Sequence, residues 1–498
     1  MLLTASACSE PTLITCVFLV LAVLLALAFE FVNGFHDTAN AVATVIYTNT
    51  LKATPAVVWS GIWNLVGVLT SSGLVAFGIV ALLPVELVLN IGSAAGFAMV
   101  FSLLISAILW NVGTWYLGLP ASSSHTLIGS IIGVGLASSL MGPTHSISEG
   151  VNWAKAQDVG LGLLISPLVG FCASALLLLL CKALVKKPSL YRAPKGDAPP
   201  PFWIRSILML TSTGVSFAHG SNDGQKGMGL IVLILVGILP GTYALKMSAD
   251  HSTVSEVAVS AKSLGSVFEK SAAGATVGDK EASESLTAFI KSSRKLTPEV
   301  FAALADKCGD LLRRLEPLET LEDLPPNERG TVRTDLYLIT KAITKIEKSG
   351  GLTNPAELAA ATQLKKNGDE LTNFIPAWVK YAVALALGLG TMIGYKRIVV
   401  TVGEKIGKHH MTYAQGGAAG LVAMSTILVA GHYGLPVSTT HVVTSGVAGT
   451  MAANKSGLQM ATLRNILMAW VLTLPVCIFL GALLFAFGLN LVALLGLG

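Results

Sequence analysis

The sequence predicts an all-α integral membrane protein with two related halves and a soluble helical insert in the second half. Hydrophobic residues make up 53% of the 498-residue chain and charged residues only 12%, against about 25% in an ordinary soluble domain. Apolar segments of spanning or half-spanning length recur along the chain, and we expect about ten to twelve membrane elements. Two polar motifs also occur twice, in the same order in each half.

The apolar segments differ in length, which predicts that some of them do not cross the membrane alone. A hydrocarbon core of about 30 Å needs about 20 residues of helix, so we expect broken or re-entrant helices among the shorter segments. The first run, residues 12–30, lacks the basic start and the cleavage site of a secretory signal and should be retained. The six cysteines show no paired spacing, so they predict neither a metal nor a redox cluster.

Charge divides the chain into five segments. Residues 245–372 hold 17 of the 33 basic and 19 of the 28 acidic residues, and their apolar residues recur at helical spacing. The loop over 182–205 is basic and proline-rich, which favours the cytoplasmic side, but a second basic group at 396–408 competes for that side. The predicted organisation is membrane repeat 1 (1–185), a basic linker (186–203), the first part of repeat 2 (204–244), the insert (245–372) and the rest of repeat 2 (373–498).

The internal repeat consists of two motif pairs. Gly-Phe-His-Asp at 34–37 matches Gly-Ser-Asn-Asp at 220–223, and Gly-Leu-Pro-Ala-Ser-Ser-Ser-His at 118–125 matches Gly-Leu-Pro-Val-Ser-Thr-Thr-His at 434–441. The aspartate and the histidine are 88 positions apart in the first half and 218 in the second, and the excess of 130 is close to the 128 residues of the insert. The repeat therefore predicts two equivalent halves, the second interrupted by the insert.

Asp37 and Asp223 each follow a glycine-containing turn inside an apolar stretch. Such a turn can break a helix at membrane depth, and a carboxylate there costs several kcal/mol unless it is paired or neutralised. Ionisable residues inside membranes usually mark ion pathways, so we expect the two aspartates to bind the coupling ion, with Asn40 and Gln225 beside them. The alternative is a structural carboxylate that caps a half-helix.

Two hydroxyl blocks, 122–124 and 438–440, follow prolines that suit the first turn of a helix. The N-terminus of a half-helix presents free amides and a positive dipole end, which favour a bound anion. One block alone could as easily bond back to its own helix, but two matched blocks favour an oxyanion site. Lys226 should pair with an aspartate or with the anion, unless it snorkels to the interface. The predicted anion-binding residues are Ser122, Ser123, Ser124, Ser438, Thr439, Thr440, Asn222 and Lys226.

Several polar residues are secondary candidates. Glu30 suits either a proton relay or a packing role. His125 and His441 occupy equal positions, and we expect a structural role for them rather than proton handling. His36 and His219 are predicted to make local hydrogen bonds. No nucleophile with a base and no nucleotide-binding loop occurs, so neither an enzyme nor a bound cofactor is predicted, and no metal site is assigned.

These motifs resemble the signature repeats of the inorganic phosphate transporter (PiT) family over the whole membrane portion of the chain. Residues 34–43 and 219–229 look like its bacterial low-affinity branch. The resemblance implies inverted-topology repeats in a bacterial inner membrane, and phosphate uptake coupled to protons in that branch or to sodium elsewhere. Phe35 and His36 replace the commoner Ala-Asn and remove an amide oxygen that a sodium site could use, which favours a proton.

The resulting prediction is a phosphate symporter driven by a cation gradient, with H+ favoured over Na+. The resemblance also implies that phosphate travels as a neutral complex with a divalent metal. We expect Asp37, Asp223 and the two hydroxyl blocks to meet near the midplane of the membrane. The alternatives are a sodium-coupled phosphate symporter, a sulfate or other oxyanion symporter, and an anion channel. Phosphate and lipid are the expected partners, nucleic acid is not expected, and a homodimer is left open.

Overall fold

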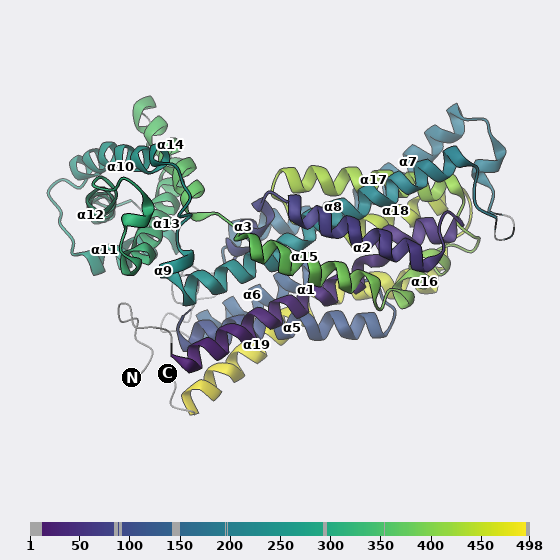
Figure 1. The fold of residues 1–498 in the computed structure, drawn as a ribbon, viewed down its shortest axis with the longest axis horizontal. Helices are drawn as coiled ribbons and strands as arrows, with labels where there is room; N and C mark the ends of the chain where they lie inside the picture. The colour runs from purple at the N-terminus through teal and green to yellow at the C-terminus, as the bar shows by residue number, and fades with distance from the viewer. Residues whose placement is uncertain are drawn as a thin grey trace.

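The computed structural model describes residues 12–494 except 84–87, 89–91, 142–149, 195, 197, 292–295 and 353. Its described part is helical, and an isolated bridge joins Gly407 to Leu458. Figure 1 shows an elongated bundle of long helices with a separate group of shorter helices at one end. The predicted all-α class is therefore confirmed.

The bundle contains helices from both halves of the chain. The first half contributes α1 (Leu13–Tyr47), α2 (Ala53–Thr70), α3 (Leu74–Val80), α5 (Ala94–Tyr116), α6 (Ser123–Met141) and α7 (Trp153–Leu184). After the short turn η2 (Pro188–Tyr191), the second half contributes α8 (Phe202–Ile238), α9 (Pro240–Tyr243), α15 (Ala377–Met392), α16 (Lys396–Glu404), α17 (Tyr413–His432), α18 (Thr439–Ala453) and α19 (Met460–Leu494).

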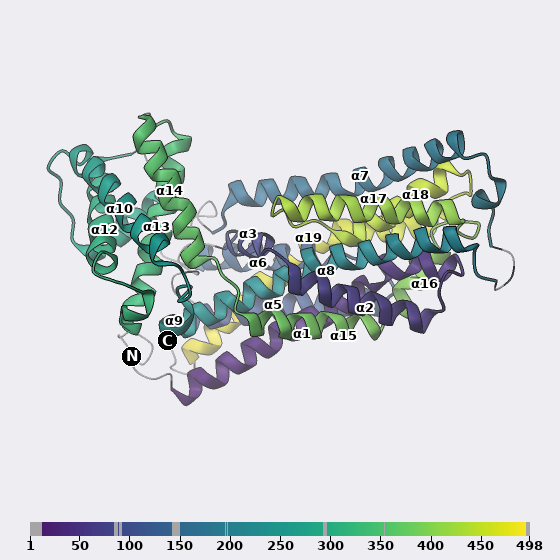
Figure 2. The same ribbon diagram turned by 45° about the horizontal axis from the view of Figure 1, so that its top comes forward.

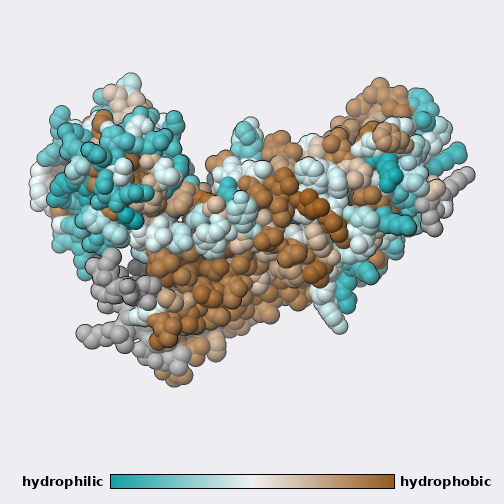
Figure 3. Space-filling model, viewed as in Figure 1, coloured by the Kyte–Doolittle hydropathy of each residue, from teal (hydrophilic) through white to brown (hydrophobic). Residues whose placement is uncertain are grey.

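The surface of the bundle is that of a membrane protein. Among the described residues, seven helices are long and apolar enough to cross a membrane, or eight if the bent pair of Pro355–Thr372 and α15 counts as one span. Large apolar side chains such as Leu176, Val471 and Phe479 are 65–71% exposed, and Figure 3 shows apolar surface over the bundle with polar surface at both ends. A soluble protein could not leave so much apolar surface in water.

The two aspartate motifs lie inside continuous helices, which differs from the expected break at their glycines. Helix α1 runs through Asp37 for 35 residues and α8 through Asp223 for 37. The glycines allow close packing instead, because a Cβ on Gly34 would lie 2.3 Å from the Leu387 carbonyl oxygen of α15. The equivalent Cβ on Gly220 would lie 2.1 Å from a carbonyl oxygen of α2. Helices α6 and α18 start within the bundle, directly after the proline motifs.

Packing in the two halves follows the same pattern. Helix α1 packs on α15 as α8 packs on α2, and α6 packs on α19 as α18 packs on α7. A Cβ on Gly390 of α15 would lie 2.1 Å from the Phe31 carbonyl oxygen, and one on Gly67 of α2 would lie 2.2 Å from that of Phe217. Each phenylalanine precedes its aspartate by six residues. Helices α1 and α8 run in opposite directions in Figures 1 and 2; the inverted relation of the complete halves stays a prediction.

The charged segment between α9 and α15 forms its own helical body. It comprises α10 (His251–Ser271), α11 (Asp279–Lys291), α12 (Pro298–Leu315), the turn η3 (Leu321–Asp323), α13 (Pro326–Lys348) and α14 (Pro355–Thr372). Phe268, Leu311 and Ile339 belong to an apolar core separate from those of the bundle. The Arg333 guanidinium donates to the carbonyl oxygens of Ala244 (2.8 Å) and Thr372 (2.6 Å), which ties together the two chain segments that enter and leave the insert.

The two basic segments, residues 182–205 and 396–408, lie at the same end of the bundle, although the sequence alone suggested that only one of them marks the cytoplasmic side. The linker reaches the end of α1, where Asn49 Nδ2 donates to the Gly196 carbonyl oxygen at 2.7 Å. Helix α16 packs on the same end of α1 through Gly403 and Tyr47. Figures 1 and 2 show this end far from the insert. Since positive charge gathers on the cytoplasmic side, this arrangement predicts that the insert faces the outer side.

Cysteine labelling tests this orientation. In a chain that keeps only Cys308, we expect Ser263→Cys in the insert to react with an impermeant maleimide in intact spheroplasts, and Ser189→Cys in the linker to react only after the membrane is opened. Both serines are exposed. Cys308 should stay silent because it is buried and burial raises the pKa of its thiol to about 12. The reverse labelling pattern would place the insert in the cytoplasm.

Candidate functional site

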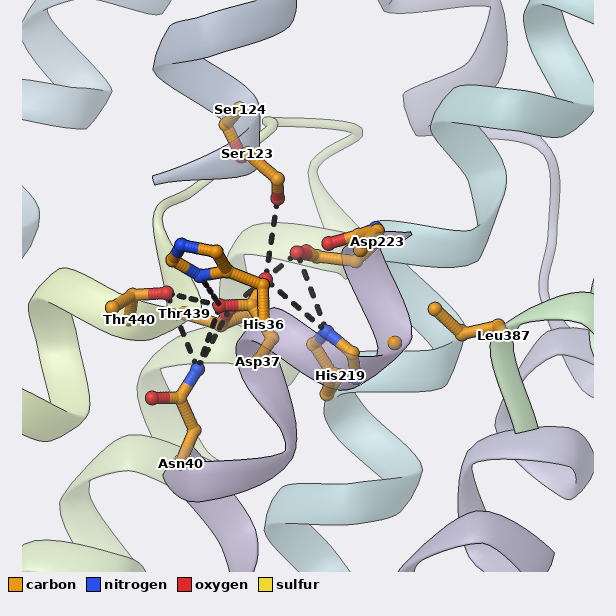
Figure 4. A network of polar contacts seen from close by, with 12 residues as sticks. His36, Asp37, Asn40, Ser123, Ser124, His219, Asp223, Leu387, Thr439 and Thr440 are labelled. Carbon is orange, nitrogen blue, oxygen red and sulfur yellow. Dashed lines mark hydrogen bonds and ion pairs between the residues drawn. The ribbon is translucent and has the colours of Figure 1, made fainter. Parts of the chain in front are cut away.

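Two aspartates from the two halves meet inside the bundle, at the contact between α1 and α8 (Figure 4). His219 lies between them, with its Nε2 atom 3.6 Å from Asp37 Oδ2 and 3.6 Å from Asp223 Oδ2. All three residues are at most 2% exposed. Their ligand atoms lie within 4.8 Å of one another, as in a site that holds a cation.

A proton is needed in this group. His219 Nδ1 lies 2.7 Å from the side-chain oxygen of Asn64 on α2, a contact that suits the tautomer with a hydrogen on Nδ1. The other ring nitrogen then faces two carboxylates, and its lone pair would repel them unless a proton lies between. With that proton on His219, and with Lys226 nearby, two positive charges balance two negative ones. Loss or gain of one proton therefore changes the charge of the buried group.

Both hydroxyl blocks donate to the aspartates. Ser123 at the start of α6 donates to Asp37 Oδ2 at 3.2 Å, and Thr440 in the first turn of α18 donates to Asp37 Oδ1. Thr439 donates to Asp223 Oδ2 at 3.4 Å. Figure 4 shows the two helix starts on different sides of Asp37. The structure thus brings together the two aspartates and the two hydroxyl blocks that the sequence singled out.

Each aspartate also has a partner three residues further along its own helix. Asn40 Nδ2 donates to Asp37 Oδ1 at 3.2 Å and to the last hydroxyl of the second block at 3.3 Å. In the other half, Lys226 Nζ lies 2.9 Å from Asp223 Oδ2 and donates to the last hydroxyl of the first block at 2.6 Å. Lys226 is fully buried, so it does not snorkel to the interface. The two halves share this arrangement, with the amide of Asn40 in one half and the ammonium of Lys226 in the other.

The first hydroxyl of each block caps its helix. Ser122 Oγ accepts from the His125 backbone N–H at 3.2 Å, and Ser438 Oγ accepts from that of His441 at 3.1 Å. The two imidazole rings lie 4.6 Å apart, and His441 stacks on Trp470 at 3.9 Å. These contacts hold the starts of α6 and α18 together. They fit the structural role that the sequence predicted for both histidines.

Three other candidates lie around the site rather than in its centre. Glu30 Oε1 accepts from the Gly227 backbone N–H at 2.7 Å, one turn beyond Asp223. Asn222 Nδ2 donates to the Leu435 carbonyl oxygen at 3.2 Å, in the loop before α18. Gln225 Oε1 accepts from backbone amides in the first turn of α3. Gln225 therefore binds the end of a neighbouring helix, whereas the sequence had suggested that it contacts the ion.

Sequence reasoning undervalued His219 and missed its partner Asn64. The signal for His219 was present, because its four-residue spacing from Asp223 places both side chains on one face of a helix. Asn64 gave no such signal, since it lies on a helix without a repeated motif. His36 is closer to its prediction: its Nε2 atom lies 3.2 Å from Thr114 Oγ1, and its other nitrogen lies 4.0 Å from Asp37 Oδ1.

Comparisons with known proteins agree on the family. Residues 33–481 match the model of the phosphate transporter family. The low-affinity inorganic phosphate transporter PitA of Escherichia coli K12 is 41% identical over 477 residues, which cover 93% of this chain and 95% of PitA. PitB of the same strain, also a low-affinity inorganic phosphate transporter, is 39% identical over 95% of this chain and 97% of its own.

A more distant relative and a solved structure extend this likeness. A probable low-affinity inorganic phosphate transporter of Bacillus subtilis is 26% identical over 95% of this chain and 97% of its own. The solved structure, titled "The sodium-dependent phosphate transporter", superposes with a TM-score of 0.52 and 20% identity, covering 96% of this chain and all of the other. At that identity the likeness concerns the fold.

Proposed function

Because the chain belongs to the phosphate transporter family, we propose that it is a secondary active symporter that takes up inorganic phosphate with protons. It is an integral membrane protein of the bacterial inner membrane. The observation that carries the proposal is the convergence of hydroxyl donors from both halves on Asp37 and Asp223. These donors are suited to an oxyanion, because a phosphate oxygen and a carboxylate oxygen accept the same kind of hydrogen bond.

Shared donors couple the two substrates in this proposal. While Asp37 is ionised, the hydroxyls of Ser123 and Thr440 donate to it, and its charge repels an incoming phosphate. Protonation removes that charge and weakens the carboxyl group as an acceptor. The hydroxyls can then turn to phosphate oxygens, while the amides at the starts of α6 and α18 and the Lys226 ammonium add positive potential. Phosphate therefore binds best to the protonated site.

A proton is the favoured coupling ion because of the groups around Asp37. Sodium requires several oxygen ligands, whereas three of the nearest partners of this carboxylate are the nitrogens of His36, His219 and Asn40. Imidazoles exchange protons near neutral pH. The His219 bridge between two carboxylates offers a place where a single proton changes the charge of the whole site.

We further propose that the phosphate can travel with a divalent metal ion as its neutral complex. Two carboxylates and an imidazole are ligands that a divalent metal accepts, and Asp37, Asp223 and His219 offer them within 4.8 Å. The metal is cargo in this proposal. Neutralising phosphate before it enters a buried site removes most of the cost of desolvating a dianion.

Uptake of labelled phosphate by purified protein in proteoliposomes tests the function. An inward proton gradient in sodium-free choline buffer should drive accumulation, and a protonophore should abolish it. Accumulation that requires sodium would contradict proton coupling. Rapid equilibration without accumulation under any gradient would indicate a channel.

Two further arms of the assay define the cargo. A hundredfold excess of unlabelled sulfate should leave phosphate uptake unchanged, because sulfate carries no proton at neutral pH and cannot donate to a site carboxylate. Chelation of divalent metals should lower the rate, and added magnesium should restore it. Strong inhibition by sulfate would make the protein a general oxyanion symporter, and full uptake in chelator would refute the metal complex.

A further inference from the structure

A basic pocket lies at the C-terminal end of α7, which we expect to face the cytoplasm, away from the transport site. It has a volume of about 400 Å³ and is formed where α7 ends and the chain turns into η2. Its lining includes Lys182, Lys186, Lys187 and Arg192, together with Tyr191 and Val185. Four cationic side chains around one small pocket are favourable for a ligand with a phosphate group.

The pocket is held in place by hydrogen bonds. The Tyr191 hydroxyl donates to the carbonyl oxygens of Cys181 (2.7 Å) and Val185 (2.9 Å), so η2 is fixed against the last turn of α7. Two of the cations also rest on aromatic rings, since Lys182 Nζ lies 5.8 Å from the Tyr191 ring centre and Lys187 Nζ lies 5.1 Å from that of Trp203. These contacts hold both ammonium groups beside aromatic rings.

No carboxylate neutralises these cations among the residues that the structure describes. Asp197 is the only acidic residue in the sequence between 159 and 222, and it lies outside the described residues. The ion pairs that the structure contains elsewhere do not involve the four lining cations. Positive charge at a helix C-terminus is partly explained by the helix dipole, but that role needs one or two charges rather than four around a pocket.

The pocket continues into a lipid-facing apolar stripe. Leu168, Phe171 and Leu179 precede Lys182 by 14, 11 and 3 residues, which places them on the same face of α7 as that lysine, and because they are 37–62% exposed they form one apolar row on the membrane surface. The row ends where the basic pocket begins. Trp203, whose ring lies beside Lys187, is a residue type typical of the headgroup level. A ligand with both acyl chains and an anionic headgroup matches this combination of surfaces.

We propose that this pocket binds the phosphate headgroup of an anionic phospholipid, whose acyl chains lie along the row of Leu168, Phe171 and Leu179. The location is consistent with this ligand, because anionic lipids give the cytoplasmic leaflet its negative surface and attract juxtamembrane basic groups. The lysines that line the pocket donate to the headgroup phosphate, and Arg192 can bind two of its oxygens at once. Free inorganic phosphate shares the headgroup chemistry but lacks the chains that would use the apolar row.

Native mass spectrometry of the purified full chain, titrated with phosphatidylglycerol or phosphatidylcholine, tests the proposal. The variant with Lys182, Lys186, Lys187 and Arg192 all changed to Gln should bind phosphatidylglycerol at least about tenfold more weakly. The control changes four exposed lysines at the same end of the bundle to Gln, namely Lys52, Lys405, Lys408 and Lys455. This control removes the same charge and should retain wild-type affinity. Phosphatidylcholine should bind weakly to all three proteins.

Further arms separate the lipid from free phosphate and from a folding defect. Inorganic phosphate at 100-fold excess over the lipid should not displace phosphatidylglycerol, and displacement would assign the pocket to the free anion. The pair Lys186→Gln and Arg192→Gln alters only exposed side chains and should lower lipid affinity severalfold even if the fourfold variant does not fold. An equal loss of phosphatidylglycerol affinity in the pocket and control variants would mean that general surface charge, and not the pocket, binds the lipid. That result would overturn the proposal.

Discussion

Replacing Asp37 with asparagine should abolish gradient-driven accumulation of phosphate while the protein still folds. An imposed gradient of two pH units supplies about 2.7 kcal/mol per proton, enough for about hundredfold accumulation of phosphate if one proton is coupled to each phosphate. Asparagine has nearly the same size and keeps one oxygen for the hydroxyl donors of Ser123 and Thr440, but it cannot take up a proton. The accumulation ratio should therefore fall from about 100 towards 1.

Exchange separates loss of coupling from loss of structure. Asp37→Asn should retain some exchange of labelled for unlabelled phosphate without any gradient, because the two hydroxyl blocks and Lys226 remain. Asp158→Asn is the matched control, since Asp158 is exposed at the start of α7 and its loss should leave accumulation at the wild-type ratio. Accumulation by Asp37→Asn at the wild-type ratio would show that this carboxylate does not carry the coupling proton.

The internal repeat made it possible to predict the candidate site from the sequence. A lone aspartate in an apolar stretch has a structural alternative, and so does a lone hydroxyl block. Two copies in the same order fix which residues are equivalent, and equivalent residues in a two-fold arrangement tend to meet where the halves meet. The structure has this property: Asn40 and Lys226, three residues after their aspartates, bind the last hydroxyls of opposite blocks. The spacing of the repeat located this centre without any three-dimensional information.

Glycine explains why the course of α1 and α8 was harder to predict. Gly34 and Gly220 permit either a break or a close approach of another backbone, and sequence pattern does not distinguish the two. The deciding contacts come from Leu387 and Asn64, which lie on helices far away in the sequence. The same holds for Gln225, whose partners on α3 become neighbours only through packing. Contacts between helices that are distant in the sequence therefore determine the course of α1 and α8 and the partners of Gln225, which local sequence patterns do not predict.

The distribution of basic residues predicted the membrane orientation only once the fold was known. The basic groups at 182–205 and 396–408 looked like competitors for the cytoplasm because almost two hundred residues separate them. Helices α1 and α16 bring them to one end of the bundle, so both satisfy the same rule. The expected orientation of the insert follows from this arrangement, although its own nearly balanced charges gave no direction.

The effects of replacing Lys226 and Asp223 on protein stability should be coupled, so that the double variant is more stable than either single variant. Phosphate transport, in contrast, should require both residues. Their charged atoms lie 2.9 Å apart and both side chains are at most 1% exposed. Removing one partner leaves the other charge buried, which typically costs about 3–5 kcal/mol, so Lys226→Met and Asp223→Asn should each lower the thermal unfolding midpoint by several degrees. The double variant removes both charges and should recover most of the wild-type midpoint.

Transport should not recover with stability. The double variant lacks the positive charge next to Ser124 and one carboxylate beside His219, so phosphate uptake should stay near background although the protein is folded. Lys246 and Glu370 provide the matched control, because this pair lies 3.5 Å apart but is 35% and 44% exposed. Removing either partner there should change stability by less than about 1 kcal/mol. A double variant no more stable than the single ones would mean that the two buried charges are not coupled, and recovered uptake would mean that the site does not need them.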